Sequence, residues 1–335
     1  MRRISPFLFS LLALLLAIGL SIAVGSVFIP PADLWRVLTG QTPLTVEKAA
    51  TIILTLRLPR TALLLLTGAA LGTSGAAYQG LFRNPLADPF LIGVASGAGL
   101  GAVLAMSVKW PYTPLGLFAV PAAAFAGALL TVFLVYSLAR VGKTLPTTNL
   151  ILAGVAFSSF ATAISSYLML RSTGELRRAI AWQLGGSTST GWGPVLGILP
   201  FLLTGLAGLL LAGHALNVLQ FGDDQARQMG LPVTRARTLI LVAASLSTAA
   251  AVAFSGIIGF IGLIVPHLMR LWFGADYRRL LPLSLLGGAA ALLLADVLAR
   301  VLLASQELPV GIVTALVGAP FFLWVLRRAK NQGYW

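Results

Sequence analysis

The chain has 335 residues, of which 58% are hydrophobic and only 10% are charged, and its mean hydropathy is +0.94. Soluble domains carry about 25% charged residues, so this composition excludes an ordinary soluble protein and indicates an all-α polytopic membrane protein. The net charge of +14 fits arginine-rich cytoplasmic loops, and no basic patch interleaved with aromatic residues indicates nucleic-acid binding.

The first apolar stretch covers residues 7–28 and follows Arg2 and Arg3. A cleaved signal peptide is one interpretation of this pattern. The stretch is long enough to span a bilayer, however, and it lacks a clean small-x-small cleavage site. We therefore expect an uncleaved first span with the N-terminus in the cytoplasm. Residues 30–60 are of mixed polarity and predict an external loop with short helical pieces.

Nine further apolar runs follow the external loop. Together with the first they predict about ten transmembrane helices, since each run approaches the length that crosses a hydrocarbon layer of roughly 30 Å. An even number places both termini on one side, the cytoplasmic one. The nine runs are 61–82, 90–108, 115–138, 149–170, 194–211, 239–254, 257–273, 280–303 and 310–326.

Positive charges favour the side assigned to the cytoplasm, but several remain outside and need an explanation. One interpretation is that their long stems lie in lipid and their heads in water. Another is a docking surface for an acidic partner, because arginine binds carboxylates through two hydrogen bonds. The outside set is Arg36, Lys48, Arg57, Arg60, Lys109, Arg171, Arg177, Arg178 and Arg300.

Chemical motifs are scarce in this chain. Cysteine is absent, and two distant histidines, His214 and His267, do not indicate a metal site. Without a G-x-x-x-x-G-K-[ST] phosphate loop, the chain is not expected to bind or hydrolyse ATP itself, and we expect no cofactor on it. Asp296 and Arg300, four residues apart on one predicted helix, indicate a structural or surface pair rather than a proton relay.

Glycines recur at four-residue intervals in two of the predicted spans, at Gly68 and Gly72 and at Gly93, Gly97 and Gly101. Small residues at this spacing let helix backbones approach closely. We expect them to pack helices within the subunit rather than to form a seam between two copies.

The polar segment 221–238 is the longest interruption between apolar runs in the second half of the chain. Asp223 and Asp224 favour the start of a short helix, and Gly230 and Pro232 favour its end. A short helix held between two spans suits contact with a soluble partner, although a solvated loop has the same composition.

Several motifs together resemble one family, the permease subunits of ABC importers for ferric siderophores, haem and cobalamin. Each motif alone is weak, but their order and spacing cover nearly the whole chain. They are Arg57-Leu-Pro-Arg60, Asn84-Pro-Leu-Ala-Asp-Pro89, Gly222-Asp-Asp-x-Ala-Arg-x-x-Gly230, Gly259-Phe-Ile-Gly-Leu-Ile-Val-Pro-His-x-x-Arg270, Glu307-Leu-Pro-x-Gly311 and Gly318-Ala-Pro-Phe321.

The resemblance implies a single transmembrane permease domain, residues 1–335, with the type II ABC importer architecture. Such permeases are homodimers in the cytoplasmic membrane of bacteria. Two cytoplasmic ATPase subunits, which hold ATP and Mg, bind the inner face, and a periplasmic or lipoprotein binding protein delivers substrate to the outer face. Membrane lipid surrounds the spans.

The resemblance also assigns roles to residues. The coupling loop, residues 221–238, would dock into the ATPase, and Arg57, Arg60 and Arg300 would bind glutamates of the binding protein. Asn84, Leu86, Thr147 and Thr148 would form inner gates, and Ser172 and Thr173 an outer gate, although such residues also cap helices and turns. The coupling residues are Gly222, Asp223, Asp224, Ala226, Arg227, Gly230, Arg235 and Arg237.

The predicted function is ATP-driven import of a metal chelate by alternating access. Ferric siderophores or haem are the first expectation, and cobalamin or another corrinoid is the alternative. An ion-gradient-driven secondary transporter is an alternative from another class. It is disfavoured because no span has a clear carboxylate near its middle.

Overall fold

A computed structural model describes residues 5–25, 27, 29–41, 47–108, 110–111, 113–142, 145–171, 176–185, 191–303 and 307–330. The regular elements of this described part are helices. Seven are long and apolar enough to cross a membrane, and three shorter apolar helices match the remaining predicted spans. The prediction of an all-helical protein with about ten membrane-crossing helices is confirmed.

The ten helices follow the predicted runs closely. They are α1 (Pro6–Ala23), α4 (Leu58–Leu81), α5 (Val94–Met106), α6 (Pro114–Ala139), α7 (Thr147–Arg171), α9 (Gly193–Leu211), α12 (Val233–Ser255), α13 (Ile261–Phe273), α14 (Tyr277–Val301) and α15 (Val310–Lys330).

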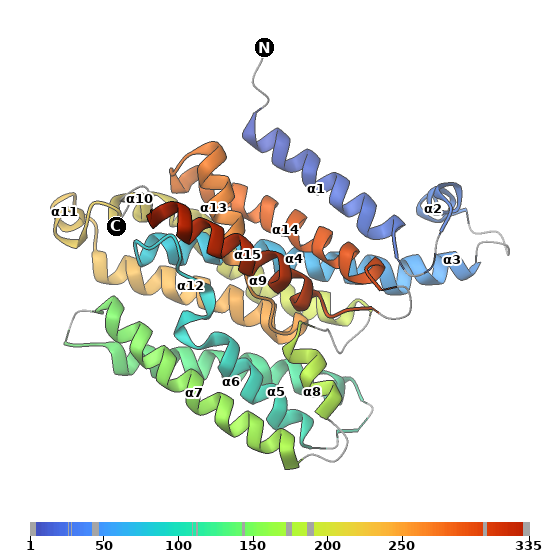
Figure 1. Cartoon of the computed structure of the whole chain (residues 1–335), viewed down its shortest axis with the longest axis horizontal. Coiled ribbons are helices and arrows are strands. Elements are labelled where there is room, and N and C mark those ends of the chain that lie inside the picture. Colours follow the sequence, from blue (N-terminus) through green and yellow to red (C-terminus); the bar gives the residue numbers. More distant parts are fainter. Residues whose placement is uncertain are drawn as a thin grey trace.

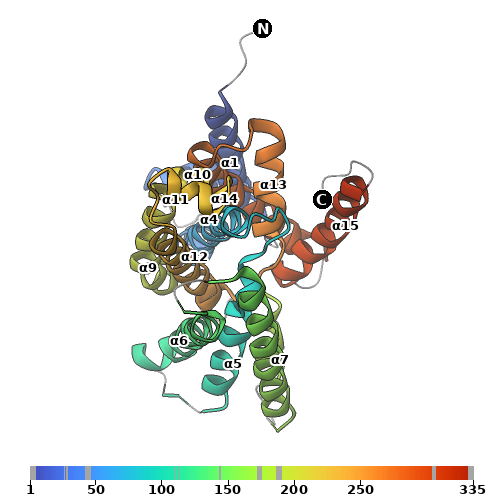
Figure 2. The same cartoon turned by 90° about the vertical axis from the view of Figure 1, so that its left-hand side faces the viewer.

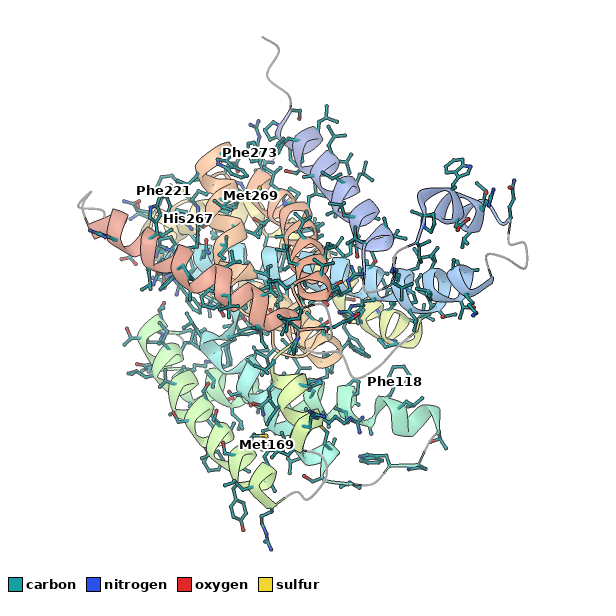
Figure 3. All side chains as sticks on the ribbon, turned by 45° about the vertical axis from the view of Figure 1, so that its right-hand side comes forward. Phe118, Met169, Phe221, His267, Met269 and Phe273 are labelled. Atoms are coloured by element: carbon teal, nitrogen blue, oxygen red, sulfur yellow. The ribbon has the colours of Figure 1, made fainter. Side chains whose placement is uncertain are left out.

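Short helices lie at the two ends of this bundle. At one end are α10 (Gly213–Leu219) and α11 (Asp223–Gln228), and at the other are α2 (Pro31–Leu38) and α3 (Glu47–Thr51) (Figure 1). We call them the α11 end and the α2 end. Alternation of the helices brings the connections 82–93 and 274–276 to the α11 end, together with residues 140–142, and the C-terminal end of α15 points there too. Phe221, at the start of the coupling loop, also lies far from α2 (Figure 3).

The bundle has two groups of helices. α4 lies at the centre and packs against α14, α12 and α13, while α5 packs against α6 and α7. Viewed from the α11 end, α5, α6 and α7 form one side of the molecule, with α13 and α15 on the other (Figure 2). α1 packs mainly on α14. Many large apolar side chains remain exposed on α1, α7 and α15, as expected for helices that face lipid or another subunit.

The small-residue patterns pack helices inside the subunit, as predicted. A Cβ added at Gly68 would collide with the backbone of Gly288 on α14, and one at Gly72 with that of Ser284. Gly97 and Gly101 make equivalent contacts with α6, against Gly127 and Ala123. The absence of a side chain at these positions lets the two backbones approach to contact distance.

Four predicted helix starts differ from the structure by four residues or more. α5 begins at Val94 instead of residue 90, and α12 begins at Val233 instead of residue 239, so residues 233–238 of the coupling loop belong to α12. The second helix was expected from residue 61, but helix begins at Glu47 and continues through α3, the π-helix η2 (Ile52–Arg57) and α4 without interruption. The eighth span was expected from residue 257, directly after a tight turn. Residues 256–260 are instead an extended connection in which Gly256 and Phe260 both have positive φ, and α13 begins at Ile261. Gly256 and Ile258 are buried, so protein covers part of this irregular backbone.

Candidate functional site

The coupling loop forms the predicted helix–turn at the α11 end. Gly222 precedes α11 with φ +101° and Gly230 ends it with φ +83°. These left-handed values favour glycine, which explains both positions. Ala226, on the inner side of α11, is fully buried, whereas Asp224 and Arg227 on α11 and Arg235 at the start of α12 (Val233–Ser255) are exposed. α11 therefore presents a charged outward face, as a docking helix would.

Within the coupling loop the structure brings Asp223 and Arg237 together. Arg237 Nη2 donates to Asp223 Oδ1 at 2.8 Å, and its side chain is only 10% exposed. Asp224 and Arg227 form a separate, exposed pair at 3.0 Å within α11. The first pair fixes α11 against the start of α12, so these two predicted residues serve the internal geometry of the loop rather than its outward face.

A second set of contacts holds α10 against the start of α14. Asn217 Nδ2 donates to Asp276 Oδ1 at 2.6 Å, and Asn217 Oδ1 accepts from the Tyr277 backbone N–H at 2.8 Å. The Asn217 hydrogen bond, followed by one from the Arg278 backbone, lowers the pKa of Asp276. Asp276 thus stays ionised and caps α14. Sequence reasoning missed this anchor because its members are about 60 residues apart.

The predicted inner-gate residues Asn84 and Leu86 lie in the connection between α4 and α5. Asn84 Oδ1 accepts from the Leu86 backbone N–H at 2.9 Å. Asp88 Oδ1 accepts from the Phe90 backbone N–H at 2.7 Å and begins the short helix η3 (Pro89–Ile92). Burial raises the pKa of Asp88 to about 6. Two consecutive side-chain caps therefore give this connection, residues 82–92, a defined shape.

The other predicted inner-gate residues, Thr147 and Thr148, begin α7, and Thr148 is exposed. α7 packs directly on the segment that follows Leu86, because a Cβ at Gly154 would collide with the Leu91 carbonyl oxygen. Ser158 Oγ also accepts a hydrogen bond from Ser96 Oγ at 3.0 Å. The two inner-gate pairs are therefore carried by elements in mutual contact. Ser172 and Thr173, the predicted outer gate, lie outside the described residues.

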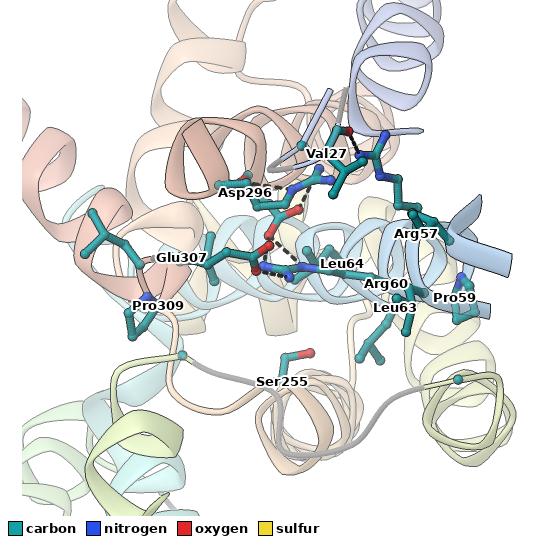
Figure 4. Close-up of a pocket in the computed structure, with 18 residues that line it drawn as sticks. Val27, Arg57, Pro59, Arg60, Leu63, Leu64, Ser255, Asp296, Glu307 and Pro309 are labelled. Carbon is teal, nitrogen blue, oxygen red and sulfur yellow. Dashed lines mark hydrogen bonds and ion pairs between the residues drawn. The ribbon is translucent and has the colours of Figure 1, made fainter. Parts of the chain in front are cut away.

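The arginines predicted to dock a binding protein gather at the α2 end, around a cavity of about 440 Å³ (Figure 4). Arg60 Nε and Nη2 donate to Asp296 Oδ1, and Arg60 Nη1 donates to Glu307 Oε2 at 2.6 Å. Arg300 Nη2 lies 2.9 Å from Asp296 Oδ2. We call these four residues and Arg57 the outer cluster.

Two of the three arginines are held inside the subunit. Arg57 is 7% exposed and donates to the carbonyl oxygens of Ile22, Ala23 and Val27. Arg300 is 5% exposed and donates to the carbonyl oxygens of Ser21 and Val24. Both bind the chain where α1 ends. The Arg60 side chain is 38% exposed, so it is the member of the three that an incoming carboxylate reaches most easily.

Asp296 and Arg300 form a buried structural pair, with side chains 1% and 4% exposed. This confirms the structural interpretation of their i, i+4 spacing. Sequence reasoning did not include Glu307 among the site residues, although it placed it in a motif. No local signal links Glu307 to Arg60, because 247 residues separate them.

The arrangement defines a class: a polytopic membrane protein with a short charged helix at one end and an arginine–carboxylate cluster at the other. Comparison with known proteins identifies the family. The chain belongs to the FecCD transport family, whose model matches residues 12–328. It is a permease of the ABC-transporter type, and the resemblance inferred from the motifs is confirmed.

Several relatives are similar over most of this chain. The cobalamin import system permease protein BtuC of Halobacterium salinarum is 46% identical over 84% of this chain and 74% of its own length. The vitamin B12 import system permease protein BtuC of Klebsiella pneumoniae is 41% identical over 99% and 96%. The ABC transporter permease protein YvrB of Bacillus subtilis is 41% identical over 97% and 93%.

Solved structures agree with this assignment. An ABC transporter described as of the metal-chelate type, in an inward-facing conformation, matches with a TM-score of 0.82 and 30% identity, covering 96% of this chain and 98% of that one. PsaBC from Streptococcus pneumoniae matches with a TM-score of 0.55 at 18% identity, covering 82% and 94%. The second match shows a shared fold alone.

Proposed function

We propose that two copies of this chain form the path by which an ABC importer carries a corrinoid, such as cobalamin, across a bacterial cytoplasmic membrane. The observation that carries the choice of substrate is the similarity to permeases named for cobalamin or vitamin B12, at 46% and 41% identity. This reverses the order expected from the motifs, in which ferric chelates came first and cobalamin second.

Two ATPase subunits dock at the α11 end in this proposal, and ATP and Mg bind to them rather than to the permease. The exposed charges at this end support this, since Asp224 and Arg227 on α11 and Arg235 at the start of α12 are exposed. Both chain termini then lie in the cytoplasm. ATP binding and hydrolysis would move α11, and the gates at the two ends would open in turn.

A substrate-binding protein docks at the α2 end in this proposal. The outer cluster supports it, because Arg60 is partly exposed beside a cavity and a guanidinium binds carboxylates through two parallel hydrogen bonds. The burial of Arg57 and Arg300 gives them a supporting role, in which they hold the end of α1 in place beside the docking point.

A ferric siderophore or haem is the second candidate substrate. The similarity to a transporter of the metal-chelate type supports the broader class, and exposed Arg171 and Arg177 at the α2 end would attract acidic ligands. The ion-gradient alternative loses its support, because the family assignment places the chain with ABC permeases.

Competition between substrates tests the proposal. Proteoliposomes would contain the permease and its ATPase, with the binding protein outside and ATP inside. Radiolabelled cobalamin should accumulate, and unlabelled cobalamin should suppress uptake while a ferric siderophore or haem does not. Uptake of the ferric chelate or haem in place of cobalamin would overturn the choice of substrate.

A further inference from the structure

The end of α4 is the point where the coupling loop meets the inner-gate connection. Gln220, which follows α10, donates from Nε2 to the Gly80 carbonyl oxygen at 3.0 Å. Gly80 has no side chain, and a Cβ there would collide with Tyr277 and Leu216. The last turn of α4 is therefore packed tightly against α10 and the start of α14.

Arg83 directly follows this turn and has an unusual backbone. Its φ is +51°, a left-handed value that is uncommon for a residue with a branched, bulky or long side chain. The Arg83 backbone N–H donates to the Gly80 carbonyl oxygen, and the Asn84 backbone N–H donates to the Gln79 carbonyl oxygen at 3.0 Å. This reversal turns the chain out of α4 and into the residues Asn84–Leu86.

The Arg83 side chain points back to the coupling loop. Its Nη2 lies 3.7 Å from Asp223 Oδ1, the same oxygen that Arg237 binds. A Cβ added at Gly222 would lie 3.4 Å from Arg83 Nη1, so the guanidinium also lies against the residue before α11. Asp223, the first residue of α11, thus connects α11 to α12 through Arg237 and to the end of α4 through Arg83.

We infer that Arg83 is a positioning residue for coupling, the group through which movement of α11 reaches the Asn84–Leu86 constriction. The inference rests on the proposed function, and it adds a residue outside the predicted coupling and gate sets. The physical reason is connectivity. The Arg83 side chain forms an ion pair with the first residue of α11, and Asn84 follows Arg83 directly in the chain. The caps at Asn84 and Asp88 then join residues 82–92, so that they would move as one unit.

The ion pair between Arg83 and Asp223 can be removed without unfolding the subunit, because neither side chain is buried. The Arg83 side chain is 44% exposed and that of Asp223 is 31% exposed. A partly exposed ion pair contributes little to folding. Loss of the Arg83–Asp223 ion pair should therefore leave the permease–ATPase complex intact. It should still weaken the link between movement of α11 and movement of the predicted inner gate at Asn84 and Leu86.

The test is the coupling ratio, which is the number of substrate molecules imported per ATP hydrolysed, in proteoliposomes with the ATPase and the binding protein. Arg83→Asn removes the guanidinium but keeps a residue that tolerates left-handed φ. We expect a coupling ratio lowered roughly two- to fivefold, as for loss of one partly exposed ion pair. Arg83→Lys, which keeps the charge, should lie nearer to the wild type.

Two further comparisons test whether the effect comes from the Arg83–Asp223 ion pair itself. Arg279→Gln removes an exposed arginine in the first turn of α14, at the same end but in neither the coupling set nor the gate set, and should leave the ratio unchanged. The double variant Arg83→Asn/Asp223→Asn should be no worse than Asp223→Asn alone if the two residues act through each other. An additive defect in the double variant would overturn the inference.

Other outcomes are equally decisive. A coupling ratio of Arg83→Asn equal to that of Arg279→Gln would overturn the inference while leaving the proposed function intact. Loss of the permease–ATPase complex in Arg83→Asn, measured by co-purification, would also overturn it, because Arg83 would then be an assembly residue. Failure of the proposed function is separate, since the wild type itself would then show no ATP-dependent uptake.

Discussion

The Arg60 guanidinium donates from both Nε and Nη2 to one carboxylate oxygen, Asp296 Oδ1, at 3.1 and 2.8 Å. This contact joins the start of α4 to α14 across 236 residues of sequence. The other oxygen of Asp296 faces Arg300 at 2.9 Å. Asp296 therefore supports both arginines, and through Arg300 it also supports the end of α1.

Removing the charge of Asp296 should destabilise the subunit. Asp296→Asn leaves Arg300 buried without its counter-charge, and the expected loss in the free energy of unfolding is about 3–5 kcal/mol. Glu307→Gln is the matched control, because the Glu307 side chain is 40% exposed and its pair with Arg60 is worth about 1 kcal/mol or less. Thermal unfolding in detergent measures both, and equal effects of the two changes would contradict this assignment.

Docking of the binding protein should depend on Arg60 and be opposed by Glu307. Glu307 occupies Arg60 Nη1 in the free subunit, so it competes with an incoming carboxylate. We expect Arg60→Glu to weaken binding roughly tenfold or more, and Glu307→Gln to strengthen it about two- to fivefold. Surface plasmon resonance measures the affinity of the binding protein for the purified permease–ATPase complex that carries each substitution. Weaker binding by Glu307→Gln would show that Glu307 itself contacts the partner.

Arg57 should act on stability instead of on docking. Because its guanidinium binds three carbonyl oxygens at the end of α1, Arg57→Gln leaves buried acceptors unpaired, at about 1–3 kcal/mol each. The melting temperature should fall, while the affinity of the folded fraction for the binding protein stays close to that of the wild type. A reduced affinity with an unchanged melting temperature would restore Arg57 as a docking residue.

The contact between α4 and α14 should not tolerate a single added methyl group. Gly68→Ala places Cβ against the Gly288 backbone, and overpacking of this kind costs about 1–3 kcal/mol. Gly19→Ala on α1 is the matched control, since nothing lies within 4 Å of its added Cβ. The melting temperature should fall in the first variant only. Equal melting temperatures would show that the two helices can separate at no cost.

Asp88 should give the stability of the subunit a pH dependence. Its pKa is raised to about 6 in the folded state, against its ordinary value of 3.8. The unfolded chain therefore loses this proton more easily than the folded one, and the free energy of unfolding falls as pH rises from about 4 to about 6. Asp88→Asn keeps the cap on Phe90 without the charge. It should therefore be more stable than the wild type at pH 7.5, and this advantage should disappear as the pH falls towards 4.

A second substitution separates the charge of Asp88 from its cap. Asp88→Ala removes both, so it should be less stable than Asp88→Asn by about 1 kcal/mol at every pH. Thermal unfolding between pH 4.5 and 7.5 provides the comparison. A constant difference between Asp88→Asn and the wild type across this range would contradict a raised pKa.

Much of the fold could be predicted because a helix that crosses a bilayer needs about 20 predominantly apolar residues. The predicted run 149–170 and helix α7, for example, differ by two residues at the start and one at the end. The start of the second helix could not be predicted in the same way. Residues 47–57 include charges that hydropathy assigns to a loop, yet they form helix α3 and the π-helix η2, which ends at Arg57.

The site was harder to predict than the fold, because its contacts join distant parts of the chain. The positions of Arg57, Arg60 and Arg300 at one end follow from the order of the spans. Their partners do not, since Arg57 binds carbonyl groups about 30 residues away and Arg300 binds some about 280 residues away. No role was predicted for Arg83, and its contact with Asp223 depends on a reversal of the backbone that no local pattern indicates.

ATP-dependent uptake is the most direct test of the central claim, that this chain is the permease of an ATP-driven importer of a metal chelate. The measurement uses proteoliposomes with the permease and its ATPase, with the binding protein outside, and compares cobalamin, haem and a ferric siderophore with and without internal ATP. We predict uptake of cobalamin that requires ATP. Uptake by the permease alone under an imposed proton gradient, without ATP, would contradict the account.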